Sequence, residues 1–409
     1  MVAYWRLKHA FRDLPEPERG LRLKGAIEGL ARLRASLLEK IPERKVGKTL
    51  LLGTWNIRNF DDNRFGHGPR HPESFFYLAE IISAFDILAV QEICADLTPF
   101  ERLMDTLGPA YDFIMTDVTL GPGGNRERLA FVFDRNKVRF SGIAGELVLP
   151  FDDQISDGTK QRQFARTPFS CTFQAGWFKF AFATVHIYFG DDAPNSPQFE
   201  RRVKEIDAVA KFIAGQAKAD TERAHILVGD FNIEGYKDRT FDALEKHGFE
   251  VFRNKIGSNT DETKFYDQIS FMPDPKRVML ADPASEKAHG VFNPFISVFR
   301  PEDFALFDEV IIDLTERRKA EAQAEITALT EKLEKPDLSA SARKRAEGQR
   351  KTAENALALQ EARLADAALR EDYYLEEWRT FQISDHFPLF VELDIDFADE
   401  YLAGLAGAG

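Results

Sequence analysis

Six short polar strings stand within or directly after apolar runs, and they limit what this 409-residue chain can fold into. They are TWN (54–56), QE (91–92), VH (185–186), GDFN (229–232), YDQI (266–269) and SDH (384–386). The neighbouring runs, such as FDILAV and AHILV, are typical of strands buried on both faces. The packing of a hydrophobic core does not require Asp, Glu or His at the ends of such strands. The pattern therefore predicts a polar site where several strands end.

The segments between these strings predict an α/β protein. The stretches 73–85 and 196–216 have helical spacing, and each precedes a strand. The stretch 128–140, and the pair 167–174 and 178–187, have the pattern of antiparallel ribbons joined by turns. Mixed strand directions with helices between them predict a layered α/β sandwich and not a purely parallel sheet.

The N-terminal segment, residues 1–48, is expected to be helical. Its helix carries Leu23, Ile27, Leu30, Leu33 and Leu37 at helical spacing. Basic residues lie between these positions, so we expect a helix packed on the main domain with a solvated basic face. A contact with a membrane or a partner is the alternative.

Residues 314–370 are predicted to form a helical hairpin inserted into the main domain. Their composition is dominated by Ala, Glu, Lys, Arg, Leu and Gln, with one break at KPDLS (335–339). The hairpin follows a predicted strand, FDEVIID (307–313), and precedes the strand that contains SDH. The main domain is therefore expected to comprise 49–313 and 371–395, followed by a C-terminal tail, 396–409.

A basic cluster lies near the predicted tip of the hairpin. It comprises Arg343, Lys344, Arg345, Arg350 and Lys351. A solvated helix face explains the cluster most simply, and a grip on a substrate backbone or a partner is the alternative. The hairpin could also form a homodimer contact, because its seam of small alanines is shallow.

Charge and cysteine content restrict the classes of function. The formal net charge of -13 disfavours tight, sequence-independent binding to nucleic acid, although bound cations and local arginines can still attract a polyanion. The two cysteines, Cys94 and Cys171, lie beside apolar runs, so no disulfide framework is expected. We find no secretory signal and no apolar run long enough for a membrane span, and we expect a cytoplasmic protein.

The residue types in the six strings suit the cleavage of phosphoesters. This reaction needs an activated water, neutralisation of the nonbridging oxygens and stabilisation of the leaving oxygen. A few carboxylates and amides are the ligands that Mg²⁺ prefers, with Mn²⁺ as a substitute. Zinc is not expected, because closely spaced His and Cys ligands are absent from the sequence.

The six strings, in this order, resemble the endonuclease/exonuclease/phosphatase superfamily, which includes deoxyribonuclease I. GDFN and SDHFP are specific in combination, whereas TWN and QE alone are weak. The resemblance implies a four-layer α/β sandwich in which two packed mixed β-sheets are flanked by helices. It also implies that Glu92 binds the metal, that Asn56 is its amide partner and that Asp385 completes the metal shell.

The same resemblance implies the catalytic groups. Asp230 would orient or deprotonate the attacking water, and Asn232 would hold a phosphate oxygen. His186 would lie near the leaving group with Glu127 as its partner.

The resemblance gives the second histidine and one arginine as well, and the position of Arg70 in the sequence adds another arginine. His386 would face the scissile phosphate, with Asp267 as its partner. Arg166 would contact the substrate phosphate, for which its fork of donors is suited. Arg70, in the segment before the first helix of the main domain, could reach the cleft.

Three functions remain open on this reading. The first is a Mg²⁺-dependent phosphodiesterase, above all a DNA endonuclease. The second keeps the chemistry and acts on a phosphorylated small molecule or a lipid head group. The third is an inactive scaffold whose hairpin recruits partners, which the retention of the expected catalytic residue types disfavours.

Overall fold

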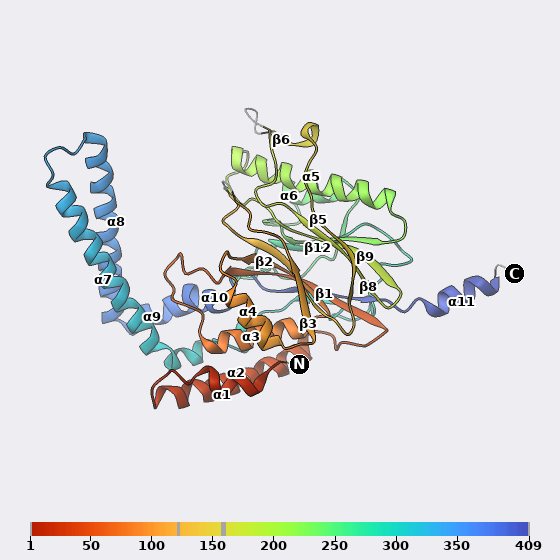
Figure 1. The fold of residues 1–409 in the computed structure, drawn as a ribbon, viewed down its shortest axis with the longest axis horizontal. Helices are drawn as coiled ribbons and strands as arrows, with labels where there is room; N and C mark the ends of the chain where they lie inside the picture. The colour runs from red at the N-terminus through yellow and green to blue at the C-terminus, as the bar shows by residue number, and fades with distance from the viewer. Residues whose placement is uncertain (1, 121–122, 157–160, 408–409) are drawn as a thin grey trace.

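The computed structural model describes residues 2–120, 123–156 and 161–407 (Figure 1). Residues 1, 408 and 409, which the predicted N-terminal segment and C-terminal tail include, lie outside the described part. Two six-stranded sheets form the centre of the molecule.

The first sheet has the order β13 (His289–Val291), β14 (Leu389–Asp394), β1 (Thr49–Phe60), β2 (Ile87–Ile93), β4 (Arg128–Asp134) and β3 (Tyr111–Met115). The second sheet has the order β11 (Glu250–Val251), β12 (Asp267–Phe271), β10 (Ala224–Asp230), β9 (Phe178–His186), β8 (Phe169–Ala175) and β5 (Arg139–Glu146). Two short strands, β6 (Ile155–Ser156) and β7 (Gln161–Arg162), pair separately. In each large sheet one central pair is parallel, β1 with β2 and β9 with β10, and the other pairs are antiparallel.

The helices precede, connect and follow these strands. They are η1 (Tyr4–Arg6), α1 (Leu7–Ala10), α2 (Glu18–Lys40), α3 (Pro72–Ser83), α4 (Thr98–Leu107), η2 (Phe151–Asp153), α5 (Pro197–Ala219), α6 (Arg239–Glu245), η3 (Pro294–Ile296), η4 (Pro301–Leu306), α7 (Asp308–Leu333), α8 (Ala340–Ala365), α9 (Ala367–Tyr373), the π-helix η5 (Tyr374–Trp378), α10 (Arg379–Gln382) and α11 (Ala398–Gly407). Among the described residues, no helix combines the length and the apolar character that crossing a membrane would require.

The sheets and helices stack in four layers (Figure 1). The inner faces of the two sheets share a core rich in phenylalanine, including Phe131, Phe173 and Phe182. Helices α3 and α4 cover the outer face of the first sheet, with α2 packed on α3, and α5 and α6 cover the outer face of the second. Strand β1 is buried along almost its whole length because both of its faces meet another layer. The predicted four-layer α/β sandwich is confirmed.

One predicted ribbon is wrong. Residues 128–140 do not form a hairpin, because β4 pairs with β2 and β3 of the first sheet, whereas β5 pairs with β8 of the second. The turn between them carries the chain from one sheet to the other. A tight turn fixes a reversal of direction, but it does not fix which sheet the returning strand joins. The other predicted ribbon, β8 with β9, is antiparallel as expected.

The segment predicted as the strand FDEVIID is instead the first part of α7. Asp308 and Glu309 lie in the first turn of this helix, where carboxylates interact favourably with the helix dipole. Ile311, Leu314 and Thr315 form its buried face at helical spacing. The run of Val and Ile was therefore a misleading signal for a strand. Helices α7 and α8 lie side by side as a hairpin that projects from the body (Figure 1).

Helix α2 packs on the main domain with most of the predicted stripe, and only Ile27 departs from it. Ile27 is 52% exposed, whereas Ala26, Leu30, Leu33 and Leu37 are buried. At Gly29 an added Cβ would lie 2.3 Å from the hydroxyl of Tyr77, so α2 and α3 are in close contact there. This close approach turns Ile27 towards solvent.

The predicted basic face of α2 is solvated only in part. Arg22 is 2% exposed, and its guanidinium forms an ion pair with Glu73 at 2.5 Å. The ring of Phe307 lies 4.8 Å from the same guanidinium. Arg22 therefore anchors α2 to the first turn of α3 and to the start of α7.

We expect Leu33→Ala to lower the free energy of unfolding by about 2–5 kcal/mol, because Leu33 is fully buried in the core to which α2 and α3 contribute. Ile27→Ala in the same helix is the matched control and should change it by about 0.5 kcal/mol or less. Urea denaturation followed by circular dichroism measures both. Equal losses for the two variants would show that α2 does not pack as described.

Candidate active site

Three polar residues occupy one row across the second sheet. Asp230, at the end of β10, is paired in register with His186 on β9 and with Asp267 on β12. Gly229 precedes Asp230 with a φ of 131°, and an added Cβ would lie 2.1 Å from the carbonyl oxygen of Val185. Only glycine fits this position, so the GDFN string keeps β10 in close contact with β9.

The first sheet contributes an amide and a carboxylate. The Nδ2 atom of Asn56 donates to Oε1 of Glu92 at 2.9 Å and to Oδ2 of Asp230 at 3.0 Å. The Oε2 atom of Glu92 accepts from the backbone N–H of Asn59 at 2.7 Å. Burial and the charge of Glu127 raise the pKa of Glu92, and His186 opposes this effect. Asn56 thus connects carboxylates that belong to different sheets.

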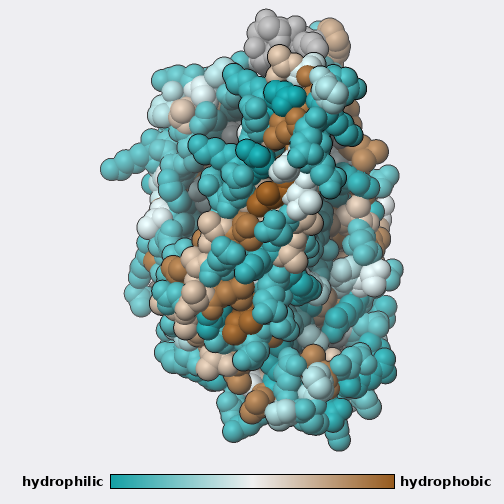
Figure 2. Space-filling view, turned by 90° about the vertical axis from the view of Figure 1, so that its left-hand side faces the viewer, coloured by the Kyte–Doolittle hydropathy of each residue, from teal (hydrophilic) through white to brown (hydrophobic). Residues whose placement is uncertain are grey.

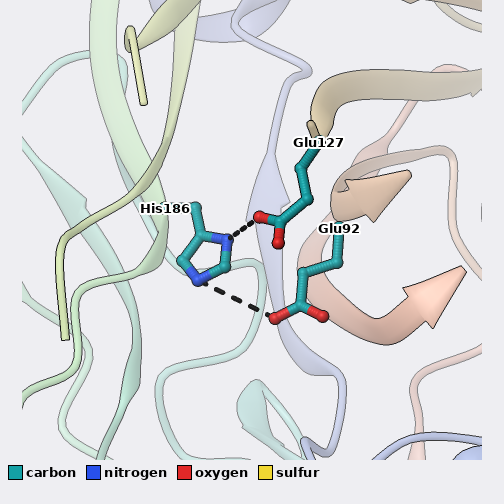
Figure 3. A group of neighbouring side chains, drawn as sticks. All are labelled: Glu92, Glu127 and His186. Carbon is teal, nitrogen blue, oxygen red and sulfur yellow. Dashed lines mark ion pairs between the residues drawn. The ribbon is translucent and has the colours of Figure 1, made fainter. Parts of the chain in front are cut away.

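His186 lies among three carboxylates, of which Figure 3 shows Glu92 and Glu127. Its Nδ1 atom is 3.2 Å from Oε2 of Glu127, and its Nε2 atom is 3.8 Å from Glu92 and 3.5 Å from Asp230. The Nε atom of Arg166 donates to the same oxygen of Glu127 at 2.7 Å. Burial works against ionisation of Glu127, but His186 and Arg166 outweigh it and lower its pKa to about 2. The structure therefore places Arg166 against Glu127 as well as beside the site.

His386 has an equivalent environment on the other side of Asp230. Its Nδ1 atom is 2.7 Å from Oδ2 of Asp267, and its Nε2 atom is 3.9 Å from Oδ2 of Asp230. Burial disfavours the charged imidazole, yet the charges of Asp267 and Asp230 outweigh it and raise the pKa of His386 well above its ordinary value. The ring of Tyr266 packs on that of His386 at a centroid distance of 5.6 Å.

Asn232 is held tightly in the turn after β10. Its Nδ2 atom donates to the carbonyl oxygen of Ile187 at 2.8 Å, and its backbone N–H donates to Oδ1 of Asp230 at 2.9 Å. Asn232 has a φ of 54°, and Glu92 has a φ of 64°. Non-glycine residues with such angles store strain and cluster at functional sites.

Asp385 stands apart from the residues above. Its side chain is 43% exposed and forms an ion pair with Nε of Arg58 at 3.5 Å. Its charge contributes to the raised pKa of Glu92, so it lies near that carboxylate. Its predicted role as a metal ligand stays a prediction.

Arg70 does not reach the cleft, contrary to our expectation. Its side chain is fully buried and forms an ion pair with Asp61 at 2.9 Å. Its guanidinium lies between the rings of Phe60 and Phe381, at 5.0 Å and 4.7 Å. A charge enclosed in this way has no access to substrate, and Arg70 instead fixes the end of β1 by donating to the carbonyl oxygens of Arg58 and Asn59.

Sequence reasoning missed Arg58. Its backbone N–H donates to Ser384 Oγ at 3.1 Å, and its guanidinium contacts Thr380 as well as Asp385. A signal was present, since Arg58 lies two residues after Asn56 in the same strand and alternate residues share a face.

Sequence reasoning also missed a polar bridge beneath the site. The Nε2 atom of Gln91 donates to Thr54 Oγ1 at 3.0 Å and to Thr184 Oγ1 at 2.8 Å. Thr184 belongs to the second sheet, so this bridge joins the two sheets within the core. Nothing in the local sequence indicates that partner.

The residues present fit a hard divalent cation. The side chains Glu92, Glu127 and His186 form one group with ligand atoms within 4.8 Å of one another, and Asp230, Asp267 and His386 form a second. In the described part of the chain, the buried Oδ1 atom of Asn56 has no hydrogen-bond partner. Such an orphan oxygen beside a carboxylate is the kind of donor that Mg²⁺ and Mn²⁺ accept.

Comparison with known proteins identifies the family. The sequence profile of the endonuclease/exonuclease/phosphatase family matches residues 53–267, which is more than half of the chain. No curated protein sequence matches the chain significantly.

Similar solved structures include an endonuclease/exonuclease/phosphatase family protein from Bacteroides thetaiotaomicron, with 18% identity, a TM-score of 0.43 and coverage of 60% of this chain and 87% of that one. A mannosyl-6-phosphatase of the same organism has 18% identity, a TM-score of 0.41 and coverage of 55% and 86%. The catalytic domain of human Nocturnin has 15% identity, a TM-score of 0.41 and coverage of 60% and 86%. The profile match confirms the resemblance seen in the sequence. The chain therefore belongs to the endonuclease/exonuclease/phosphatase family, whose members are metal-dependent phosphoesterases.

Proposed function

We propose that this protein is a Mg²⁺-dependent phosphodiesterase that cleaves DNA internally, with Mn²⁺ as a substitute. The observation that carries the proposal is the convergence of residues from both sheets on Asp230, with Asn56 and Glu92 on one side and His186, Asp267 and His386 around it. This set contains an acceptor for a water proton, two histidines held by carboxylates and hard oxygen ligands.

Asp230 is the group that we propose orients or deprotonates the attacking water. Its Oδ1 atom is held by the N–H of Asn232 and its Oδ2 atom by Asn56, so the carboxylate has a fixed orientation. Glu92, Asn56 and Asp385 would hold the metal. A bound divalent cation would neutralise charge on the phosphate and stabilise the leaving oxygen.

The two histidines would have separate roles, one at the scissile phosphate and the other at the leaving oxygen. His386, kept positive by Asp267 and Asp230, would pair with a nonbridging oxygen of the scissile phosphate. His186 would lie near the leaving oxygen, with Glu127 fixing its ring and Arg166 fixing Glu127. Because Nε of Arg166 is engaged by Glu127, a phosphate contact would have to come from its terminal nitrogens.

The surroundings of the site favour a nucleic-acid substrate. Arg58 and Arg64 have side chains that are 20% and 30% exposed. Phe65 is 54% exposed, and its carbonyl oxygen accepts from Arg318 at 2.5 Å. Arginines beside an exposed aromatic ring suit backbone phosphates and unstacked bases.

One observation favours a second candidate, a phosphorylated small molecule or lipid head group. The net charge of -13 repels a long polyanion more than it repels a small one.

For the nuclease we expect supercoiled plasmid to be nicked and a panel of phosphorylated sugars, nucleotides and phosphocholine lipids to be spared. Colorimetric phosphate release, with added phosphatase to reveal phosphocholine, measures the panel. Turnover of the panel without nicking would establish the second candidate.

We expect Asp230→Asn to reduce plasmid nicking in Mg²⁺ by at least about 100-fold, because the amide cannot accept a proton from water. Gel electrophoresis of a supercoiled plasmid measures the rate. Asp242→Asn, an exposed carboxylate on α6, is the matched control and should nick at the wild-type rate. Equal rates for Asp230→Asn and the wild-type protein would exclude the assigned role.

Removal of the metal by EDTA should abolish nicking, and added Mg²⁺ should restore it. For Glu92→Gln we expect the Mg²⁺ concentration that gives half-maximal rate to rise by about 10- to 100-fold, since a charged ligand is lost. Glu376→Gln, an exposed glutamate in η5, is the control. An unchanged Mg²⁺ requirement in Glu92→Gln would show that the cation binds elsewhere.

A further inference from the structure

We propose that the outer face of α8, near the tip of the hairpin, binds the sugar-phosphate backbone of DNA several base pairs from the scissile phosphate. This inference rests on the proposed cleavage of DNA and names the surface that holds the rest of the substrate.

The hairpin offers a face that no other part of the described chain covers. Its inner seam consists of buried small and apolar residues, Ala322 and Leu329 on α7 and Ala346 and Ala353 on α8. Figure 2 looks at the side of the molecule from which the hairpin projects, and this side is mostly hydrophilic with a narrow hydrophobic band. The residues of α8 that lie half a turn away from the seam therefore face solvent.

That outer face carries hydrogen-bond donors over the half of α8 nearest the tip, and the exposed carboxylates are confined to one flank. Its exposed residues, spaced by three or four, are Lys344, Arg345, Gly348, Lys351, Thr352 and Asn355. Since Glu347, Glu354 and Glu361 recur every seven residues, they lie together on the flank nearer α7. Glu361 reaches across the hairpin to Lys319 at 3.3 Å, and Glu354 pairs with Arg350 at 3.4 Å.

The cations of this face have no ion-pair partner among the described residues. In the parts of the chain that the structure describes, no ion pair within 4.0 Å involves Lys344, Arg345 or Lys351. Nothing lies within 4 Å of a Cβ added to Gly348. A glycine inside an exposed helix costs about 1 kcal/mol relative to alanine, and no packing within the chain explains it. Because Gly348 has no side chain, it leaves a flat patch between the cations where a phosphate backbone can approach.

The base of the hairpin is tied to the active-site loop, which fixes the distance between the two sites. The guanidinium of Arg363 lies 4.1 Å from the ring of Tyr373, whose hydroxyl is 2.9 Å from Nδ1 of His67. Along the helix axis, Lys351 and Lys344 lie about 18 Å and about 28 Å from Arg363, at 1.5 Å per residue. Counted from the base of the hairpin, these distances equal the length of roughly five to eight base pairs of duplex.

The composition of this face favours a backbone over a protein or a membrane. Protein interfaces have an apolar core, and membrane-bound helices insert large apolar side chains. Leu359, the large apolar residue of α8 that is exposed in the described chain, lies nearer the base of the helix, outside the cationic half. Lys, Arg, Thr and Asn are the usual contacts of phosphate oxygens.

The test is the salt dependence of binding to a fluorescein-labelled duplex of 30 base pairs. We compare K344Q/K351Q with K332Q/K335Q, which removes one exposed cation near the end of α7 and one just after it, both in the Asp230→Asn background with Mg²⁺. Fluorescence anisotropy from 50 to 200 mM salt should show that K344Q/K351Q lowers the slope of log affinity against log salt by about 1.8, at about 0.9 per phosphate contact. The control should keep the slope of the parent protein, and a duplex of 6 base pairs should bind all three proteins alike.

An equal loss in the two variants, or an effect that persists on the short duplex, would overturn the inference. So would a K344Q/K351Q variant that binds DNA normally and loses binding to phosphatidylserine vesicles. Hydrolysis of bis(p-nitrophenyl) phosphate by the otherwise wild-type protein reports on the chemistry separately, because this ester is too small to touch α8. If neither this ester nor DNA is cleaved, the proposed function fails, whereas cleavage of both with an unchanged slope refutes only the role of α8.

Discussion

The amide of Asn56 joins the two sheets at the point where the chemistry would occur. Its Nδ2 atom donates to Glu92 of the first sheet and to Asp230 of the second. Two carboxylates buried this close would repel each other, and one amide between them, together with the nearby His186, compensates part of that repulsion. A cation bound by the same oxygens would compensate the rest. The site is therefore arranged for a positive charge that the protein itself supplies only in part.

The layered fold explains how remote segments come together. Strand β1 lies parallel to β2, and β9 lies parallel to β10, so the carboxyl ends of each pair lie at the same edge of its sheet. The polar bridge from Gln91 to Thr184 links the sheets beneath this edge. Beside this edge, Arg70 and Asp61 fix the end of β1, whose Asn59 N–H donates to Glu92. Buried charges outside the site thus position the residues within it.

The sequence predicted the layers and that most of the candidate site residues would lie together, because strings such as GDFN and SDH combine local geometry with chemistry. Gly229 is required by the contact with β9, and Asp230 follows from its place at the strand end. Glu127 was found only through the family resemblance, since its pairing with His186 depends on a contact between sheets. The metal role of Asp385 and the phosphate contact of Arg166 stay predictions, because side-chain direction at a cleft is set by partners such as Arg58 and Glu127.

The incorrect structural predictions have one physical cause. Local sequence patterns carry no information about tertiary contacts. The turn after β4 indicated a hairpin but leads into the facing sheet. The Val and Ile residues of 307–313 suggested a strand, yet acidic residues at the first turn and a buried helical stripe place them in α7. Ile27 matched the helical stripe and is exposed, because Gly29 lets Tyr77 approach.

Anomalous diffraction from a crystal grown with Mn²⁺ tests the central claim most directly. We expect one strong peak in the active site, within coordination distance of a Glu92 carboxylate oxygen and of Oδ1 of Asn56. A peak that lies away from both atoms, or no peak at saturating Mn²⁺, would contradict the account of a metal site shared by the two sheets.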